Sequence, residues 1–144
     1  MRAVTPLLLL FAACGSTASS IKPASYSAQA EFLDPESDDP DKTLTMSDCF
    51  TVKPAEGGAI QYKFAFHFPY DHMCEMGGTA RLVKPGVWED ASQNDCRLVI
   101  ENDGKGWTVN DPDNTCRNDW CGARGSIGHS FPLSSAAPWS ECGN

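Results

Sequence analysis

The chain has 144 residues, of which 41% are hydrophobic and 21% charged, and its formal net charge is −8. This length fits a single domain with a leader and a tether. The acidic balance argues against nucleic acid as a partner, because phosphates require basic patches, and against docking on anionic lipid without an acyl anchor. It suits cationic partners, such as basic enzymes arriving at the cell surface.

An apolar stretch within residues 1–13, preceded by Arg2, is too short to cross a bilayer and has the make-up of a signal peptide. The Phe-Ala-Ala-Cys segment ending at Cys14 resembles the lipobox of bacterial lipoproteins. The resemblance implies lipidation of Cys14, and Gly15 after it favours the outer membrane. We therefore expect an envelope protein, held in that membrane only by its lipid and facing the periplasm or the surface. Ordinary cleavage near Ala18, giving a soluble periplasmic protein, is the alternative.

Residues 14–43 are rich in Ser, Ala, Pro, Asp and Glu and have few large apolar side chains. Such a segment buries too little surface to offset chain entropy, so it predicts a disordered stalk. Its acidic run at residues 34–41 predicts a self-repelling tether; a calcium or cationic-partner site is the functional alternative.

From residue 44 onward, short apolar runs alternate with Gly, Pro, Asn and Asp, which is typical of β-structure. The clearest predicted strand covers residues 59–68, where every second side chain is large and apolar. Further strands are predicted at residues 49–52, 79–83, 96–100, 105–109 and 128–131. The Asp-Gly step ending at Gly104 predicts a tight hairpin between two of them. We expect Leu98, Ile100, Trp107 and Val109 to share its buried side.

After the stalk, no ten-residue stretch has a helical period free of Gly or Pro. We therefore predict an all-β domain over residues 44–144, a small antiparallel barrel or sandwich stapled by disulfides.

Six cysteines follow the stalk: Cys49, Cys74, Cys96, Cys116, Cys121 and Cys142. In an oxidising envelope they are disulfide candidates, and they lack the paired spacing of a zinc site. Sequence leaves the pairing open. Chain geometry favours Cys116 with Cys121, Cys74 with Cys96, and Cys49 with Cys142.

Two motifs, His-Met-Cys-Glu-Met-Gly-Gly-Thr-Ala from His72 and Cys-Gly-Ala-Arg-Gly from Cys121, carry a family resemblance. Together with the Cys-Arg-Leu strand at Cys96, they resemble a group of small Gram-negative envelope proteins, over about residues 57–131. Such modules are similar in context to lysozyme-inhibitor lipoproteins. The resemblance implies a β-fold and a protein partner, for instance a basic peptidoglycan hydrolase. The loop motif of the inhibitor of C-type lysozyme is not matched, so no binding residues carry over from it.

We expect the partner-binding residues in the loop around Trp120 and Arg124. Two glycines permit a tight reversal there, and a rigid arginine can fork onto a carboxylate of a glycosidase. Trp120 would supply an apolar anchor. The structural alternative is that Arg124 caps backbone carbonyls or pairs with Asp119.

A weaker alternative is a copper site formed by His67, His72, Met73 and Met76, since imidazole and thioether bind that metal. Packing of the methionines and oxidation of the neighbouring cysteine argue against it, so no cofactor is expected. The chain has no G-x-S-x-G elbow and no cysteine free to act as a nucleophile.

The sequence therefore predicts a binding module rather than an enzyme. Its most specific form is an inhibitor of, or immunity protein against, a lysozyme-like hydrolase. The alternatives are a periplasmic copper-binding protein and a structural accessory lipoprotein of an outer-membrane complex.

Overall fold

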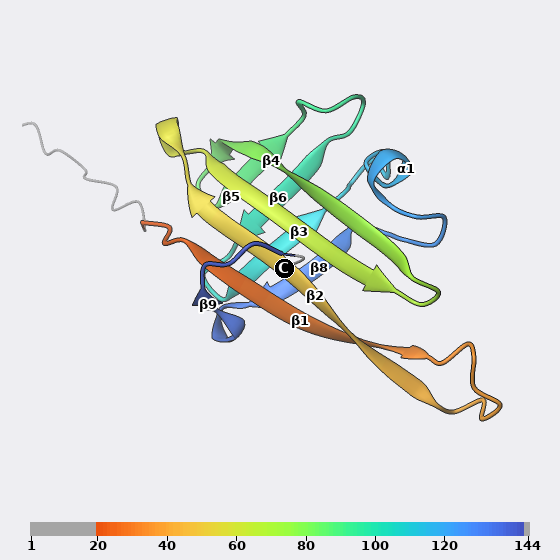
Figure 1. Ribbon diagram of the computed structural model, residues 1–144. Helices are drawn as coiled ribbons and strands as arrows, with labels where there is room; N and C mark the ends of the chain where they lie inside the picture. The colour runs from red at the N-terminus through yellow and green to blue at the C-terminus, as the bar shows by residue number, and fades with distance from the viewer. Residues whose placement is uncertain (1–19, 143–144) are drawn as a thin grey trace, which may run out of the picture.

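The computed structural model describes residues 20–142, which fold into one curled antiparallel sheet (Figure 1). Its strands are β1 (Ala24–Leu33), β2 (Thr43–Pro54), β3 (Ile60–Phe68), β4 (His72–Lys84), β5 (Val87–Asp90), β6 (Leu98–Asn102), β7 (Gly106–Asn110), β8 (Gly128–Pro132) and β9 (Ala137–Pro138). Three helical turns accompany them: η1 (Glu56–Gly58), α1 (Arg117–Trp120) and η2 (Leu133–Ser135). The predicted all-β class is confirmed.

The strands follow one another as a meander from β1 to β8, and β9 adds to the free edge of β1. β8 and β9 therefore stand at opposite ends of the strand order, although in the chain only the η2 segment separates them. The sheet must curl to allow this, and it forms a half-barrel with its core on the concave side (Figure 1).

One aromatic core fills the concave side. The strand predicted at residues 59–68 is β3, whose alternate side chains point inward, with Phe66 fully buried. The ring of Trp107 lies 5.6 Å from that of Phe50 on β2 and 5.5 Å from that of Trp88 on β5. These contacts join strands that are distant in the sheet, and each large side chain buried in this way contributes about 1.5–3 kcal/mol.

The predicted hairpin between β6 and β7 is confirmed. Gly104 in its turn has a φ of 82°, a conformation that glycine adopts without steric cost. The four side chains expected on the buried side are at most 2% exposed: Leu98, Ile100, Trp107 and Val109.

The prediction of a disordered stalk over residues 14–43 is wrong from Ala24 onward. β1 pairs with β2 without interruption, from Ala24 opposite Val52 to Leu33 opposite Thr43. The folded domain therefore begins about twenty residues before the predicted boundary at residue 44.

Residues 24–33 form a strand because inward and outward side chains alternate along them, a pattern that overall composition does not reveal. Tyr26, Ala28, Ala30 and Phe32 lie on the concave side of β1, and the ring of Tyr26 lies 6.2 Å from that of Trp107. Backbone hydrogen bonds to β2 compensate for the small size of the alanines. The acidic segment at residues 34–41 forms the turn of this long hairpin.

All six cysteines that were expected to form disulfides do so. The bonds are Cys49–Cys142, Cys74–Cys121 and Cys96–Cys116. Of the three preferred pairings only that of Cys49 with Cys142 is correct. The other two are wrong because Cys121 bridges antiparallel to Cys74 at the start of β4, while α1 stands between Cys116 and Cys121 and sends their sulfurs to different partners.

Cys14 and the predicted signal peptide at residues 1–13 lie outside the described residues. Within residues 20–142, no helix has the length and apolar composition needed to cross a membrane.

Candidate functional site

The loops that carry the expected binding residues gather at one end of the half-barrel. Since neighbouring strands are antiparallel, every second connection lies at the end opposite to the start of β1. These connections are the β1–β2 turn, the β3–β4 turn and the segments at residues 91–97 and 111–127. We call this the distal end; it lies on the right of Figure 1. Any tether that precedes β1 joins the other end.

Arg124 is held in a fixed position on this end by the loop that follows α1. The disulfide between Cys74 and Cys121 attaches the loop to β4, and the backbone N–H of Gly122 donates to the carbonyl of Met73 at 3.1 Å. Gly125 leaves no room for a side chain, since an added Cβ would lie 2.6 Å from the sulfur of Cys74. The loop is thus fixed against β4 by these contacts, while the Arg124 side chain remains exposed to solvent.

The exposed guanidinium of Arg124 stacks on an aromatic ring that the sequence did not single out. Its Cζ lies 5.1 Å from the ring centre of Tyr70, which belongs to the β3–β4 turn. A cation–π contact at such an exposed position is worth about 0.5–1 kcal/mol. Arg124 makes no ion pair within residues 20–142, and Asp119 accepts instead from the side-chain amide of Asn94 at 3.0 Å. The expected alternative, a pair between Arg124 and Asp119, is therefore wrong.

Tyr70 occupies a strained position for a residue with a side chain. Its φ is 64° and that of Asp71 is 57°, both in the left-handed region. Tyr70 as a whole is 54% exposed. Strained, exposed aromatic residues of this kind are typical of binding surfaces.

Trp120 lies beneath this surface rather than on it. Its side chain is half-buried against the core, and its indole Nε1 is buried without a hydrogen-bond partner. The expectation that Trp120 is the exposed apolar anchor is therefore replaced: Trp120 supports the loop, and Tyr70 is the aromatic residue presented beside Arg124.

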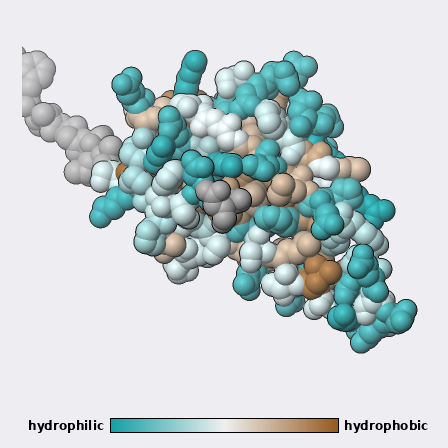
Figure 2. Space-filling view, in the orientation of Figure 1, coloured by the Kyte–Doolittle hydropathy of each residue, from teal (hydrophilic) through white to brown (hydrophobic). Residues whose placement is uncertain are grey.

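A second feature of the distal end is a projecting arm, which we define as residues 28–48. Here β1 and β2 continue past the end of β3 as a two-stranded ribbon (Figure 1). The tip is covered by hydrophilic residues, and a strongly hydrophobic patch lies behind it (Figure 2). Leu33, near the tip, is 66% exposed.

The tip of the arm is acidic and closed by hydrogen bonds. Residues 34–42 contain five carboxylates and one lysine. The backbone N–H of Asp34 donates to the carbonyl of Lys42 at 2.7 Å, and the Lys42 Nζ lies 3.1 Å from Asp34 Oδ2. The hydrogen bond from Lys42, followed by one from the backbone N–H of Glu36, lowers the pKa of Asp34. The arm therefore presents a negative, hydrogen-bonded turn.

Beneath the distal end, a buried carboxylate links three strands. Asp48 on β2 contacts His129 on β8 and the backbone of His67 on β3. The imidazole of His129 also stacks on Phe66, with ring centres 4.0 Å apart. This cluster fixes the mouth of the half-barrel.

The four residues of the copper alternative lie on two faces of the sheet. His67 and Met73 are opposite each other on the outer face, whereas Met76 is 2% exposed in the core and His72 pairs with Phe68 on the core side. One imidazole nitrogen of His67 lies 2.8 Å from the carbonyl oxygen of Ser47. In the described part of the chain, no group of three or more His, Cys, Asp or Glu side chains could hold a metal ion.

Fold and surface together define a disulfide-stapled antiparallel half-barrel whose loops at one end present Arg124 and Tyr70. A scan against protein-family models, a search of curated proteins and a search of solved structures each find no match to the chain. The resemblance to small envelope proteins therefore rests on the sequence motifs alone.

Proposed function

We propose that this protein is an envelope binding module, not an enzyme, whose distal end holds a lysozyme-like peptidoglycan hydrolase and blocks its active cleft. The observation that carries the proposal is the stacking of Arg124 on Tyr70, 5.1 Å apart, on a loop fixed by the disulfide between Cys74 and Cys121. A guanidinium held in this way loses little conformational entropy when it binds.

The chemistry of both partners supports the proposal. Glycosidases of this kind cleave with a pair of carboxylates that flank the scissile bond, and a guanidinium matches a carboxylate through two parallel hydrogen bonds. Tyr70 beside Arg124 supplies the aromatic area that dominates many interfaces. Inhibition then follows because Arg124 pairs with a catalytic carboxylate of the hydrolase, which can no longer act on the substrate.

The acidic arm favours a basic partner. Its tip carries five carboxylates against one lysine, in a chain of net charge −8, and complementary charge raises the rate of encounter. Leu33 near the tip adds exposed apolar surface. We propose that the arm grips the rim of the cleft while Arg124 enters it.

The proposed anchor agrees with this orientation. A lipid on Cys14 would connect through the start of β1, at the end opposite to Arg124. The distal end would then point away from the outer membrane and meet incoming hydrolases.

The test is the lysis of cell-wall suspensions by lysozymes and secreted hydrolases, with the oxidised chain from Ser20 onward added in increasing amounts. We expect a saturable fall in the lysis rate. Arg124→Ala should weaken inhibition about tenfold or more, since a central charged contact of an interface is worth about 2 kcal/mol or more. Tyr70→Gly should do the same without unfolding the turn, because glycine accepts a positive φ.

The matched control is Arg81→Ala, which removes another exposed arginine from β4, away from the distal end. Arg81→Ala should inhibit as the unmodified protein does. If no hydrolase is inhibited, or if Arg124→Ala and Arg81→Ala behave alike, the proposal is wrong.

A further inference from the structure

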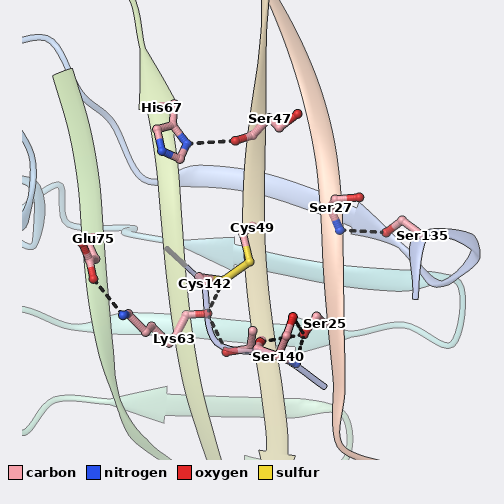
Figure 3. The surroundings of a disulfide bond; sticks show 11 residues. Ser25, Ser27, Ser47, Cys49, Lys63, His67, Glu75, Ser135, Ser140 and Cys142 are labelled. Atoms are coloured by element: carbon pink, nitrogen blue, oxygen red, sulfur yellow. Dashed lines mark hydrogen bonds and ion pairs between the residues drawn. A yellow bond between two sulfur atoms is a disulfide. The ribbon is translucent and has the colours of Figure 1, made fainter. Parts of the chain in front are cut away.

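The C-terminal segment after β9 crosses β1 and β2 on the outer face of the sheet (Figure 1). This segment is attached at two points. Ser140 exchanges hydrogen bonds with Ser25 on β1, with the Ser25 hydroxyl donating to the Ser140 carbonyl at 2.8 Å and accepting from its N–H at 2.7 Å. Beyond it, Cys142 is bonded to Cys49 on β2 (Figure 3). The crossing segment is therefore a fixed wall above the sheet.

Between this wall and β4 runs a groove with a volume of about 360 Å³. Its floor is formed by outward side chains of three neighbouring strands, including Lys53 of β2, Gln61 and Lys63 of β3, and Thr79 of β4, and its wall by Trp139. The volume falls in the range of small-molecule sites, about 300–1,000 Å³.

A glycine deepens the groove. Gly77 faces outward on β4 between Glu75 and Thr79, so the floor lacks a side chain at this point. An added Cβ would lie 3.1 Å from the carbonyl oxygen of Tyr62 and 3.4 Å from the Cβ of Lys63. The Lys63 side chain therefore packs closely beside Gly77, and the glycine keeps this part of the floor low.

The groove combines an aromatic face with polar groups. Trp139 is 40% exposed, and the ammonium of Lys53 lies 5.0 Å from the centre of its ring. Gln61 supplies an amide and Thr79 a hydroxyl, both donors and acceptors. A flat apolar face surrounded by such groups fits the alternating C–H and hydroxyl surfaces of a sugar ring.

The charges in the groove select an acidic ligand. The Nζ of Lys63 lies 2.9 Å from Glu75 Oε1, so its charge is partly compensated (Figure 3). Lys53 has no carboxylate partner within residues 20–142. Its ammonium is therefore available to a ligand carboxylate within reach. Glu141 at the edge of the groove can accept hydroxyl hydrogens.

We infer that this groove binds a short acidic saccharide, with a sugar ring stacked on Trp139 and a carboxylate paired with Lys53. Gln61 and Thr79 then bind the hydroxyl or acetamido groups of the ring. The groove shares no residue with the distal end. Saccharide binding and hydrolase inhibition can therefore be tested independently of each other.

The test is a titration of the oxidised protein, followed by ¹H–¹⁵N NMR, with a disaccharide of N-acetylglucosamine and N-acetylmuramic acid, which carries one carboxylate. Chitobiose, its uncharged counterpart, is titrated in parallel. We expect saturable shifts at Gln61, Gly77, Thr79 and the indole N–H of Trp139. The uncharged sugar should bind at least about tenfold more weakly, since one charge-assisted hydrogen bond is lost.

Substitutions of Gln61 test the effect of charge on binding without disturbing the fold, because this exposed side chain can be replaced by either Glu or Lys. Both changes remove the amide, but binding of the acidic sugar should be about tenfold weaker in Gln61→Glu than in Gln61→Lys. Lys53→Ala should weaken it likewise, whereas Lys84→Ala, an exposed lysine at the far end of β4, should leave it unchanged.

Trp139→Ala should abolish the shifts while mass measurement without reductant still shows the Cys49–Cys142 bond. The inference is overturned by an absence of shifts at millimolar sugar, by shifts confined to the distal end, or by equal binding of Gln61→Glu and Gln61→Lys.

Discussion

His129 Nδ1 lies 2.8 Å from Asp48 Oδ2, and this contact joins β8 to β2 across the inside of the half-barrel. The Asp48 side chain is 1% exposed, and its other oxygen accepts the backbone N–H of His67 at 2.8 Å. A carboxylate buried to this extent is tolerated because both of its oxygens are bonded. The pair therefore holds the curl of the sheet beneath the proposed binding surface.

Asp48→Ala should lower the free energy of unfolding by about 1–3 kcal/mol, because it leaves the N–H of His67 without an acceptor and His129 without its partner. Asp48→Asn should cost less, since the amide oxygen can still accept from His67. Urea unfolding followed by tryptophan fluorescence measures both. Asp38→Ala on the exposed arm is the control and should change nothing; equal stability of Asp48→Ala and Asp38→Ala would contradict the account.

Tyr62 should make the protein less stable in alkali. Burial, together with the 2.8 Å hydrogen bond from its hydroxyl to Asp90, raises the pKa of Tyr62 above the ordinary value of 10.0. Above about pH 10 the unfolded chain therefore loses this proton before the folded protein does, and the free energy of unfolding falls as pH rises. Below that pH the contribution is complete.

Tyr62→Phe should remove this component, so that urea midpoints decline less steeply between about pH 9 and pH 11 than in the unmodified protein. Tyr70→Phe, at the exposed tyrosine, should keep the original slope. The same alkaline slope in Tyr62→Phe and in the unmodified protein would refute this role.

The Cys49–Cys142 bond should stabilise the fold and the groove together. Replacing both cysteines by alanine frees the segment that follows β9 and should lower the free energy of unfolding by about 2–4 kcal/mol. Saccharide binding should weaken with it, whereas hydrolase inhibition should persist, because the distal end is fixed by Cys74–Cys121. An unchanged urea midpoint in this double variant would contradict the prediction.

The pKa of the Asp34 carboxyl reports whether the turn at the tip of the arm is formed. Since the hydrogen bond from Lys42 is the main cause that lowers the pKa of Asp34, Lys42→Ala should raise that pKa towards the ordinary value of 3.8. NMR titration of the side-chain carboxyl carbon measures it. Lys22→Ala, which removes a lysine outside the arm, should leave the Asp34 titration where it is. No difference between the two variants would mean that the turn is not formed as described.

The central strands could be predicted because their signal is local. In β3, large apolar residues alternate with polar ones. The Asp-Gly step of the β6–β7 hairpin indicates a tight turn by itself, because glycine adopts the positive φ that such a turn requires. β1 cannot be predicted from composition, because Ala28 and Ala30 occupy concave positions without being large and the segment resembles a linker. Its stability comes from pairing with β2, which no local window contains.

The site shows the same division. Arg124 stood out through its motif, since the glycines around it indicate a tight loop. Tyr70 gave no such signal, because the proximity of its ring to Arg124 depends on the Cys74–Cys121 bond between segments 47 residues apart. The groove depends likewise on Trp139, which a disulfide spanning 93 residues brings over β3.

The most direct measurement of the central claim is amide hydrogen exchange of the protein alone and with excess lysozyme. The account predicts slower exchange in the β3–β4 turn, in residues 121–126 and along the arm, and unchanged exchange in the β4–β5 and β6–β7 turns at the other end. Unchanged exchange throughout, or slower exchange only at those two turns, would contradict it.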